Sequence, residues 1–247
     1  MKYRDALVTE SSSKTLIITA DNSVSIGNKE HDYIKVDPKL VGALTARVAL
    51  LEAVCLNAQP IAVSCTLSFP FDSADAQNIM TGIKSEMLNY SLTEQQLTGS
   101  CESNFPATVT AIGITVISEL LNEPLINKTK LNDKIFVIGK PLVGPEVVQH
   151  KSLLPTVNTI KKLQSLKNIH EIIPCGSGGV NSELKQATLN NDCHIELVNT
   201  ELDLNKSAGP ATCLIVVGDI ELQHLQSAIN NKITLIGYVR SKNEKEY

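Results

Sequence analysis

The sequence predicts an α/β (α+β) protein built from two domains of similar size. Short apolar runs typical of buried strands alternate with segments of helical periodicity. The alternation stops once, at the polar segment 122–134, and then restarts. Of the 247 residues 43% are hydrophobic but only 4% are aromatic, so we expect a large core of Val, Ile, Leu and Ala. We predict domains at 1–122 and 123–247.

The first half is expected to mix strands with two long helices. Asp37 is a good N-cap and Pro38 suits the first helical turn, while Asn57 and Pro60 mark the end of that helix. A second helix is amphipathic, with apolar residues at helical spacing from Ala76 to Leu88. The turn residues of 21–32 separate the first two strands. The expected strands are 16–20, 33–36, 61–70 and 108–117, and the expected helices are 37–57 and 73–92.

The second half repeats the alternation with shorter elements. A Gly-rich turn, "CGSGG", follows one of its apolar runs, and "GKPLVGPE" is interpreted as a tight loop after another. The expected strands are 134–139, 170–174, 194–198, 212–218 and 232–239, and the expected helices are about 156–167, 180–191 and 221–230.

Composition excludes several classes of function. The net charge of −4 and the absence of a Lys/Arg block argue against nucleic acid as the main partner. No apolar stretch approaches the ~20 residues of a membrane span, and the N-terminus has no signal core, so we expect a cytoplasmic protein without a membrane partner. The six cysteines form no C-x-x-C pair, which disfavours zinc, iron–sulfur and disulfide frameworks. Most are expected to be buried as small hydrophobes.

The first long helix carries two isolated charges. Residues 40–57 are apolar or small on nearly all faces, which is typical of a buried helix. Arg47 and Glu52 lie five residues apart, about 140° around the helix, so they cannot simply pair on one face. Because an unpaired buried charge is costly, each needs a partner at an interface or a ligand. Both alternatives remain open, the second placing Glu52 at a metal–phosphate site.

Two aspartates near strand ends allow a metal site or ordinary turns. Asp21 directly follows an apolar strand, a common place for a metal ligand and also for an Asx-turn. Asp37 has the same ambiguity because it is also the expected N-cap. Local sequence alone favours the turn at Asp21.

Glycines at a strand–helix junction suggest an anion site, although weakly. Gly176, Gly178 and Gly179 precede a helix whose N–H groups suit an anion. Neither a G-x-G-x-x-G nor a G-x-x-x-x-G-K-[ST] motif occurs, which excludes a Walker-type nucleotide site. The five histidines are scattered and no G-x-S-x-G elbow exists, which disfavours acyl-transfer chemistry.

The stretch "TGSCESNFPATVTAIGITVIS", from Thr98 to Ser118, places Glu102 and Asn104 at the mouth of a buried strand. Such an entrance is either an ordinary turn or a ligand-binding loop.

The order of these features resembles the aminoimidazole ribonucleotide synthetase-related superfamily, which includes thiamine-monophosphate kinases. The resemblance rests on "TADNSVSIG", on "VDP" before the buried helix ending "LLEAVCLNAQP", on "LTGSCESN" before "AIGITVIS", and on "IIPCGSGGVNSEL". It spans about residues 14–240. Glu replaces the family's Asp at positions 52 and 102, and the paired aspartates are reduced to Asp21-Asn22. Among its branches the chain looks most like the alpha-ribazole kinases of cobalamin salvage.

The resemblance implies a two-domain synthetase-like fold, an N-terminal mixed sheet that pairs in a homodimer, and ATP-dependent phosphoryl transfer with Mg²⁺. The implied acceptor is the 5′-hydroxyl of a riboside, most concretely alpha-ribazole. The implied catalytic residues are Glu102 and Asn104. The implied metal ligands are Asp21, Asp37, Glu52 and Glu102. The implied ATP-binding residues are Arg47, Thr98, Gly99, Ser100, Gly176, Gly178 and Gly179.

Two alternatives stay open. The chain is either another ATP-dependent member of the superfamily acting on a different substrate, such as a thiamine-monophosphate kinase-like enzyme, or a nucleotide-binding protein that kept the fold and lost catalysis. The departures in the acidic motifs favour the second alternative slightly.

Overall fold

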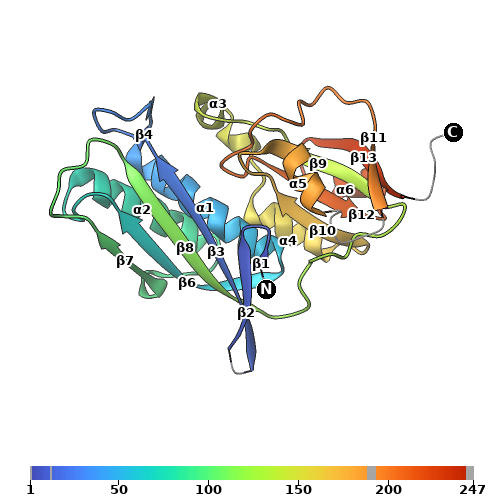
Figure 1. Cartoon of the computed structure of the whole chain (residues 1–247), viewed down its shortest axis with the longest axis horizontal. Coiled ribbons are helices and arrows are strands. Elements are labelled where there is room, and N and C mark those ends of the chain that lie inside the picture. Colours follow the sequence, from blue (N-terminus) through green and yellow to red (C-terminus); the bar gives the residue numbers. More distant parts are fainter. Residues whose placement is uncertain (1, 12, 188–192, 243–247) are drawn as a thin grey trace. The chain divides into compact units, whose positions relative to one another are not determined.

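A computed structural model describes residues 2–11, 13–187 and 193–242 of the chain. It divides into two compact units, Met1–Pro124 and Leu125–Tyr247 (Figure 1). Each unit combines one main sheet with helices, so the predicted α/β (α+β) class is confirmed. The division lies two residues beyond the boundary that the polar segment suggested. Each unit is described by itself below.

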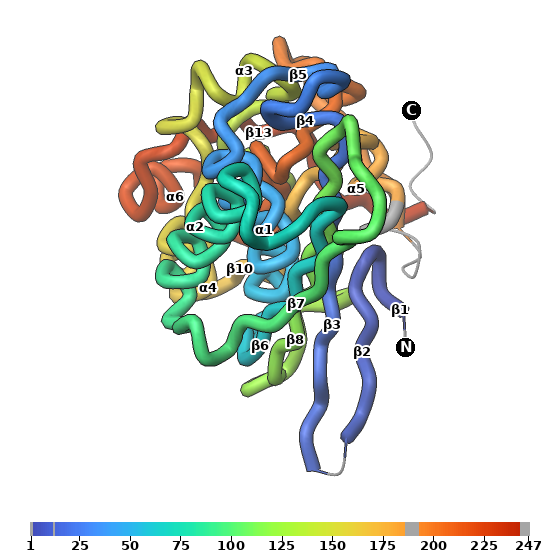
Figure 2. Tube along the Cα trace, turned by 90° about the vertical axis from the view of Figure 1, so that its left-hand side faces the viewer, coloured from blue at the N-terminus to red at the C-terminus, as the bar shows by residue number. Residues whose placement is uncertain are grey.

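The first unit contains a six-stranded mixed sheet in the order β1-β2-β3-β8-β6-β7. All neighbours are antiparallel except β6 and β7, which run parallel. The hairpin of β2 and β3 extends beyond the neighbouring strands (Figure 2). The strands are β1 (Lys2–Tyr3), β2 (Ala6–Ser11), β3 (Lys14–Val24), β6 (Ala58–Leu67), β7 (Leu97–Cys101) and β8 (Ala111–Leu120), with a separate small sheet of β4 (Ile26–Gly27) and β5 (Ile34–Lys35).

Helices α1 (Pro38–Cys55) and α2 (Ala74–Leu88) pack against each other, and α1 lies on one face of the sheet. The Asp37 side chain accepts a hydrogen bond from the Lys39 N–H at 2.9 Å, and Pro38 occupies the first turn, as predicted. Most α1 side chains are buried, which confirms the expected buried helix. A Cβ at Gly82 would lie 1.9 Å from the Lys39 carbonyl oxygen, so the two helix backbones approach too closely for a side chain there.

Two strand predictions in this unit are corrected. The segment from Asp21 was expected to be a turn, but β3 continues to Val24, because each of its residues to that point pairs with β8. The stretch Thr98–Cys101 was expected to be an ordinary turn or a ligand-binding loop, but it belongs to β7, which pairs with β6 from Val63↔Leu97 to Leu67↔Cys101. β7 is the edge strand of the sheet, and β2 pairs with β3 only as far as Ile18, so both segments have a strand neighbour on one side only. Small and polar side chains at such an edge explain why neither segment has the apolar pattern of a buried strand.

The second unit contains a five-stranded antiparallel sheet in the order β10-β12-β9-β13-β11. Its apolar side chains, including Val137, Ile215 and Val239, form a core with Val180 of α5. The strands are β9 (Lys134–Gly139), β10 (Ile169–Pro174), β11 (Cys193–Leu197), β12 (Cys213–Gly218) and β13 (Ile233–Ser241). The helices are α3 (Pro145–Gln149), α4 (Val157–Ser165), α5 (Gly179–Ala187) and α6 (Leu222–Ala228), and short 3₁₀ turns lie at Glu94–Gln96 of the first unit and Lys151–Leu153 of the second.

The elements predicted for the second unit are confirmed within a few residues, with one addition. The loop interpreted as a turn contains α3, which Pro145 begins at the first helical position. Of the helix predicted at about 180–191, the part 188–191 lies outside the described residues.

All six cysteines are free, and five of them are buried, as expected. No helix in the described ranges is both long and apolar enough to cross a membrane.

Candidate functional site

Small polar side chains form two adjacent rows across the face of the first sheet opposite α1. The inner face is identified by Thr19, whose Oγ1 donates a 2.7 Å hydrogen bond to the Ala49 carbonyl of α1. Because side chains alternate along a strand, Ala20 and Asn22 lie on the outer face. Strand register then defines what we call the polar band. Its rows are Ala20–Thr115–Ser64–Thr98 and Asn22–Gly113–Thr66–Ser100.

Most of the polar band lines a shallow hollow of about 380 Å³. A Cβ at Gly113 would lie 2.6 Å from the Thr66 hydroxyl, so the glycine leaves that hydroxyl room. Hydroxyl and amide groups can both donate and accept hydrogen bonds, which suits phosphate oxygens and sugar hydroxyls. The residues lining the hollow are Ala20, Asp21, Asn22, Ser64, Thr66, Gly113, Ile114 and Thr115.

Asp21 is the carboxylate of this region. By alternation it lies on the same side of β3 as Thr19, and it is half-buried. Burial raises the pKa of Asp21 to about 6, the nearby Asp5 raises it further, and a backbone hydrogen bond from Asn22 opposes both. A carboxyl group with a raised pKa beside a hollow is typical of functional sites.

The other predicted metal ligands do not join Asp21. Asp37 and Glu52 stand 15 residues apart near opposite ends of α1, about 22 Å along its axis. Glu102 follows β7, and three strand spacings of about 14 Å in total separate β7 from β3. These separations are too large for the carboxylates to ligate one ion. Within the described residues, no three His, Cys, Asp or Glu side chains lie close enough to hold a metal. Within the described residues of one chain, the four carboxylates therefore do not converge on one ion.

Glu102 and Asn104 form an exposed turn. The Glu102 Oε1 accepts a 2.6 Å hydrogen bond from the Asn104 N–H, and the Glu102 N–H donates to the Leu67 carbonyl at 2.9 Å. This is the ordinary turn that the sequence allowed. Both residues directly continue β7, so they lie next to the Ser100 end of the polar band.

Arg47 is buried inside the first unit and does not reach its surface. Burial lowers the pKa of Arg47, while Tyr90 and Glu86 beside α2 raise it. Its electrostatic neighbours are thus protein groups of the same unit, and neither a ligand nor a domain interface is needed to explain this charge. Glu52 lies near Cys55 instead. Burial raises the pKa of Cys55 to about 12; the charge of Arg4 opposes this rise and the charge of Glu52 adds to it.

The three glycines predicted to bind ATP, Gly176, Gly178 and Gly179, lie in a tight turn between β10 and α5. The Gly176 carbonyl accepts from the N–H groups of Gly179 and Ala208. Gly179 has φ +74°, and a Cβ there would lie 2.7 Å from the Lys206 carbonyl oxygen. Chain conformation alone therefore requires glycine at 179.

Sequence reasoning missed the hydroxyl residues of the polar band and one buried carboxylate. Asp32 accepts hydrogen bonds from the Thr110 N–H and Oγ1, both at 2.7 Å, and from the Lys29 N–H at 2.8 Å. Burial alone would raise the pKa of Asp32, but these hydrogen bonds and the charge of Lys35 lower it. Asp32 thereby fixes the loop after β3 to the start of β8.

Alternating Ser and Thr in "VSCTL" was the signal in the sequence that could have identified the polar band.

Comparisons with known proteins agree with this fold. Residues 3–117 match the family described as AIR synthase related protein, N-terminal domain. Thiamine monophosphate kinase from Aquifex aeolicus is similar in structure, with TM-score 0.69 and 16% identity over 97% of this chain and 90% of that one. A structure of AaThiL complexed with AMPPCP and TMP has a TM-score of 0.66 and 16% sequence identity, over 96% of this chain and 84% of AaThiL. The E. coli hydrogenase maturation protein HypE is similar in structure with a TM-score of 0.68 and 15% sequence identity, over 92% of this chain and 80% of HypE. No curated protein matches the chain.

Proposed function

We propose, from the match of residues 3–117 to the AIR synthase-related N-terminal domain, that this chain is an ATP-dependent small-molecule kinase. The acceptor that we propose is the 5′-hydroxyl of a riboside, most concretely alpha-ribazole, which would become alpha-ribazole 5′-phosphate in cobalamin salvage. The observation that carries the proposal is the polar band, a set of hydroxyl and amide groups across four strands of the family-matched unit. The AMPPCP complex of the similar structure AaThiL supports ATP as the donor.

The hydroxyl groups of the polar band are proposed to contact the phosphates of ATP. Thr98 and Ser100 on β7 hydrogen-bond phosphate oxygens, and Gly99 between them permits the close approach of β7 to β6, since a Cβ there would lie 2.1 Å from the Cys65 carbonyl oxygen. Ser64 and Thr66 continue the same contacts toward the centre of the sheet. Phosphoryl transfer depends mainly on positioning and charge compensation, so such contacts are the part of catalysis that this surface supplies.

Mg²⁺ enters the proposal as the counter-ion of ATP. Magnesium keeps several waters and takes substrate phosphate oxygens as ligands, so one or two protein carboxylates suffice. Asp21 is the carboxylate that we assign to the ion. Its side chain lies on the α1-facing side of β3, but β2 pairs with β3 only as far as Ile18, so Asp21 lies at an unpaired edge of the sheet beside the hollow. Glu102 and Asn104 are assigned to the acceptor side, at the exposed end of β7. Asp37, Glu52 and Arg47 have no place in the proposed site.

A homodimer is part of the proposal because the outer face of the sheet is apolar beyond the polar band. Leu7, Ile18 and Ile117 lie in one cross-strand row there, with Leu7 46% and Ile117 37% exposed. An exposed apolar row beside a polar hollow is typical of an interaction surface. Pairing two copies through this face would enclose the polar band.

ADP release tests the proposal. The purified chain is incubated with ATP and Mg²⁺ plus alpha-ribazole, thiamine monophosphate or no acceptor. We expect release to depend on alpha-ribazole. Dependence on thiamine monophosphate instead would assign the alternative substrate. An ATP-dependent thermal shift without turnover would favour the non-catalytic alternative. Neither turnover nor a thermal shift would refute nucleotide binding altogether.

A further inference from the structure

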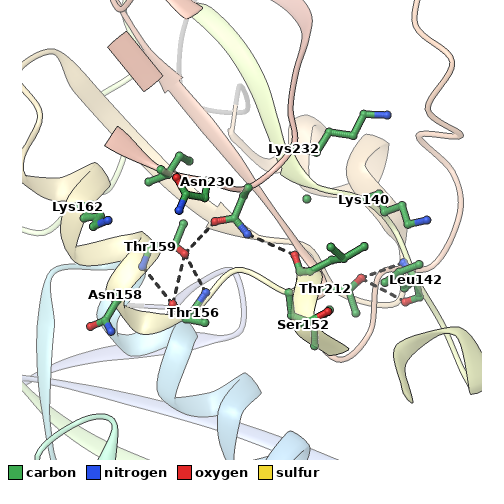
Figure 3. A pocket seen from close by; sticks show the side chains of 15 residues that line it. Lys140, Leu142, Ser152, Thr156, Asn158, Thr159, Lys162, Thr212, Asn230 and Lys232 are labelled. Atoms are coloured by element: carbon green, nitrogen blue, oxygen red, sulfur yellow. Dashed lines mark hydrogen bonds between the residues drawn. The ribbon is translucent and has the colours of Figure 1, made fainter. Parts of the chain in front are cut away.

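A second pocket lies wholly within the second unit, where the ends of several elements meet (Figure 3). Its volume is about 420 Å³, within the range of small-molecule sites. The C-terminal end of β9, the N-terminal turn of α4, the segment after α6 and the start of β12 contribute to it. Nothing in the proposed kinase site uses these residues.

Hydrogen bonds between the lining residues fix the walls of this pocket. Thr212 is buried, and its Oγ1 accepts from the Leu142 N–H at 2.9 Å and donates to the Leu142 carbonyl at 3.2 Å. On the other side, Asn231 accepts from the Thr159 hydroxyl at 3.1 Å and donates to the Leu153 carbonyl at 3.3 Å. The pocket is thus preorganised, which lowers the entropic cost of binding a ligand.

The charge of the pocket is of one sign. Lys140 and Lys232 lie on one side and Lys162 on the other (Figure 3). Among the fifteen residues drawn around it, none is acidic. Within the described ranges, none of the three ammonium groups forms an ion pair. Glu146 is near Lys140, but it is bonded to Lys206 at 2.8 Å, which with Lys140 lowers the pKa of Glu146. Three cations in a protein of net charge −4 mark a local site for an anion.

The remaining lining groups are neutral and polar. Asn158, Asn230 and Ser152 are exposed at the pocket, and Thr156 caps α4 beside them. Amide and hydroxyl groups suit the hydroxyls of a ligand, and the N-terminal end of a helix adds a favourable potential for negative charge. We propose that this pocket binds a small phosphorylated polyol, with its phosphate on the side of Lys140 and Lys232 and its hydroxyls at the asparagines and at Lys162 on the other side. This inference does not rest on the proposed kinase function.

Glycerol 3-phosphate is a suitable probe, because it carries one phosphate and two hydroxyls and is no riboside. Binding to the full chain is measured by isothermal titration calorimetry, with glycerol and sodium chloride of equal ionic strength as controls. We expect saturable binding of glycerol 3-phosphate, no binding of glycerol, and weaker binding as salt increases.

Substitutions locate the site. Lys162→Gln and Lys232→Gln change exposed side chains, so the fold should survive. Each is expected to weaken binding at least about fivefold, since each removes one charge-assisted contact. Lys161→Gln is the matched control, because Lys161 is the exposed neighbour of Lys162 on α4 and does not line the pocket. Asp21→Asn should leave binding unchanged, which separates this site from the proposed kinase site. No saturable binding, or equal weakening by Lys161→Gln, would overturn the inference.

Discussion

Asp21 on β3 and Gly99 on β7 occupy the same cross-strand row of the first sheet, connected through Ile114 and Cys65. Two segments of the predicted ATP site, 78 residues apart in the sequence, therefore lie at one level of one sheet. They do not touch, because three strand spacings separate them. The rows on either side of this one form the polar band. A ligand that contacts both ends must extend across four strands, as a nucleoside triphosphate can.

Removing one hydroxyl from the polar band should weaken ATP binding without unfolding the protein. Thr66→Val keeps the shape of an exposed side chain and removes its hydrogen-bonding group. We expect the KM for ATP to rise about 5- to 10-fold, since one hydrogen bond to a charged group is lost. Thr9→Val, on β2 of the same sheet but outside the polar band, is the control and should change little. Steady-state ADP release measures both variants, and equal effects would exclude a special role for the polar band.

Asp21→Asn should stabilise the fold and lower activity. The pKa of Asp21 in the folded protein, about 6, exceeds its ordinary value of 3.8 because of burial. The folded state therefore binds a proton more tightly than the unfolded state, and wild-type stability falls as pH rises from about 4 to 6. The neutral amide avoids this loss, so urea unfolding at pH 7 should show a gain of roughly 1–2 kcal/mol, shrinking toward pH 4. We expect turnover to fall more than about tenfold. A variant with unchanged turnover would remove Asp21 from the site.

Asp32→Asn should destabilise the first unit. The amide cannot accept all the hydrogen bonds that Thr110 and Lys29 donate to the buried carboxylate. We expect a loss of about 2–4 kcal/mol at pH 7. Because the pKa of Asp32 is lowered in the folded state, wild-type stability from this group is present above the unfolded pKa and disappears as pH falls below it. The difference between the two proteins should therefore shrink at low pH. Asp72→Asn, an exposed carboxylate, serves as the control in urea unfolding.

A charge on the apolar row should prevent pairing of two copies. Ile117→Lys places an ammonium group beside Ile18 on the outer face of the sheet. Light scattering after size-exclusion chromatography should show a dimer for the wild-type chain and a monomer for this variant, with unchanged circular dichroism. Leu88→Lys makes the same chemical change at a 68% exposed position on α2 and should remain dimeric. A monomeric wild-type chain would contradict the proposed pairing.

The sequence predicts the core elements well, because their signals are local. Asp37, Pro38 and the apolar run after them define α1 through capping and burial, and the structure confirms both. The polar end of β3 and the whole of β7 were missed, because their strand conformation depends on pairing with β8 and β6. The carboxylate site failed for a similar reason. Sequence order indicated that Asp21, Glu52 and Glu102 belong to one half of the chain, but only strand order and helix length reveal how far apart they are.

The most direct test of the account is ³¹P NMR of the full chain with ATP, Mg²⁺ and alpha-ribazole. The account predicts that the γ-phosphate resonance of ATP declines while ADP and one phosphomonoester, alpha-ribazole 5′-phosphate, increase in equal amounts, and that Thr66→Val slows this transfer. ATP that stays intact, or is converted to ADP and inorganic phosphate without a phosphomonoester, would contradict it.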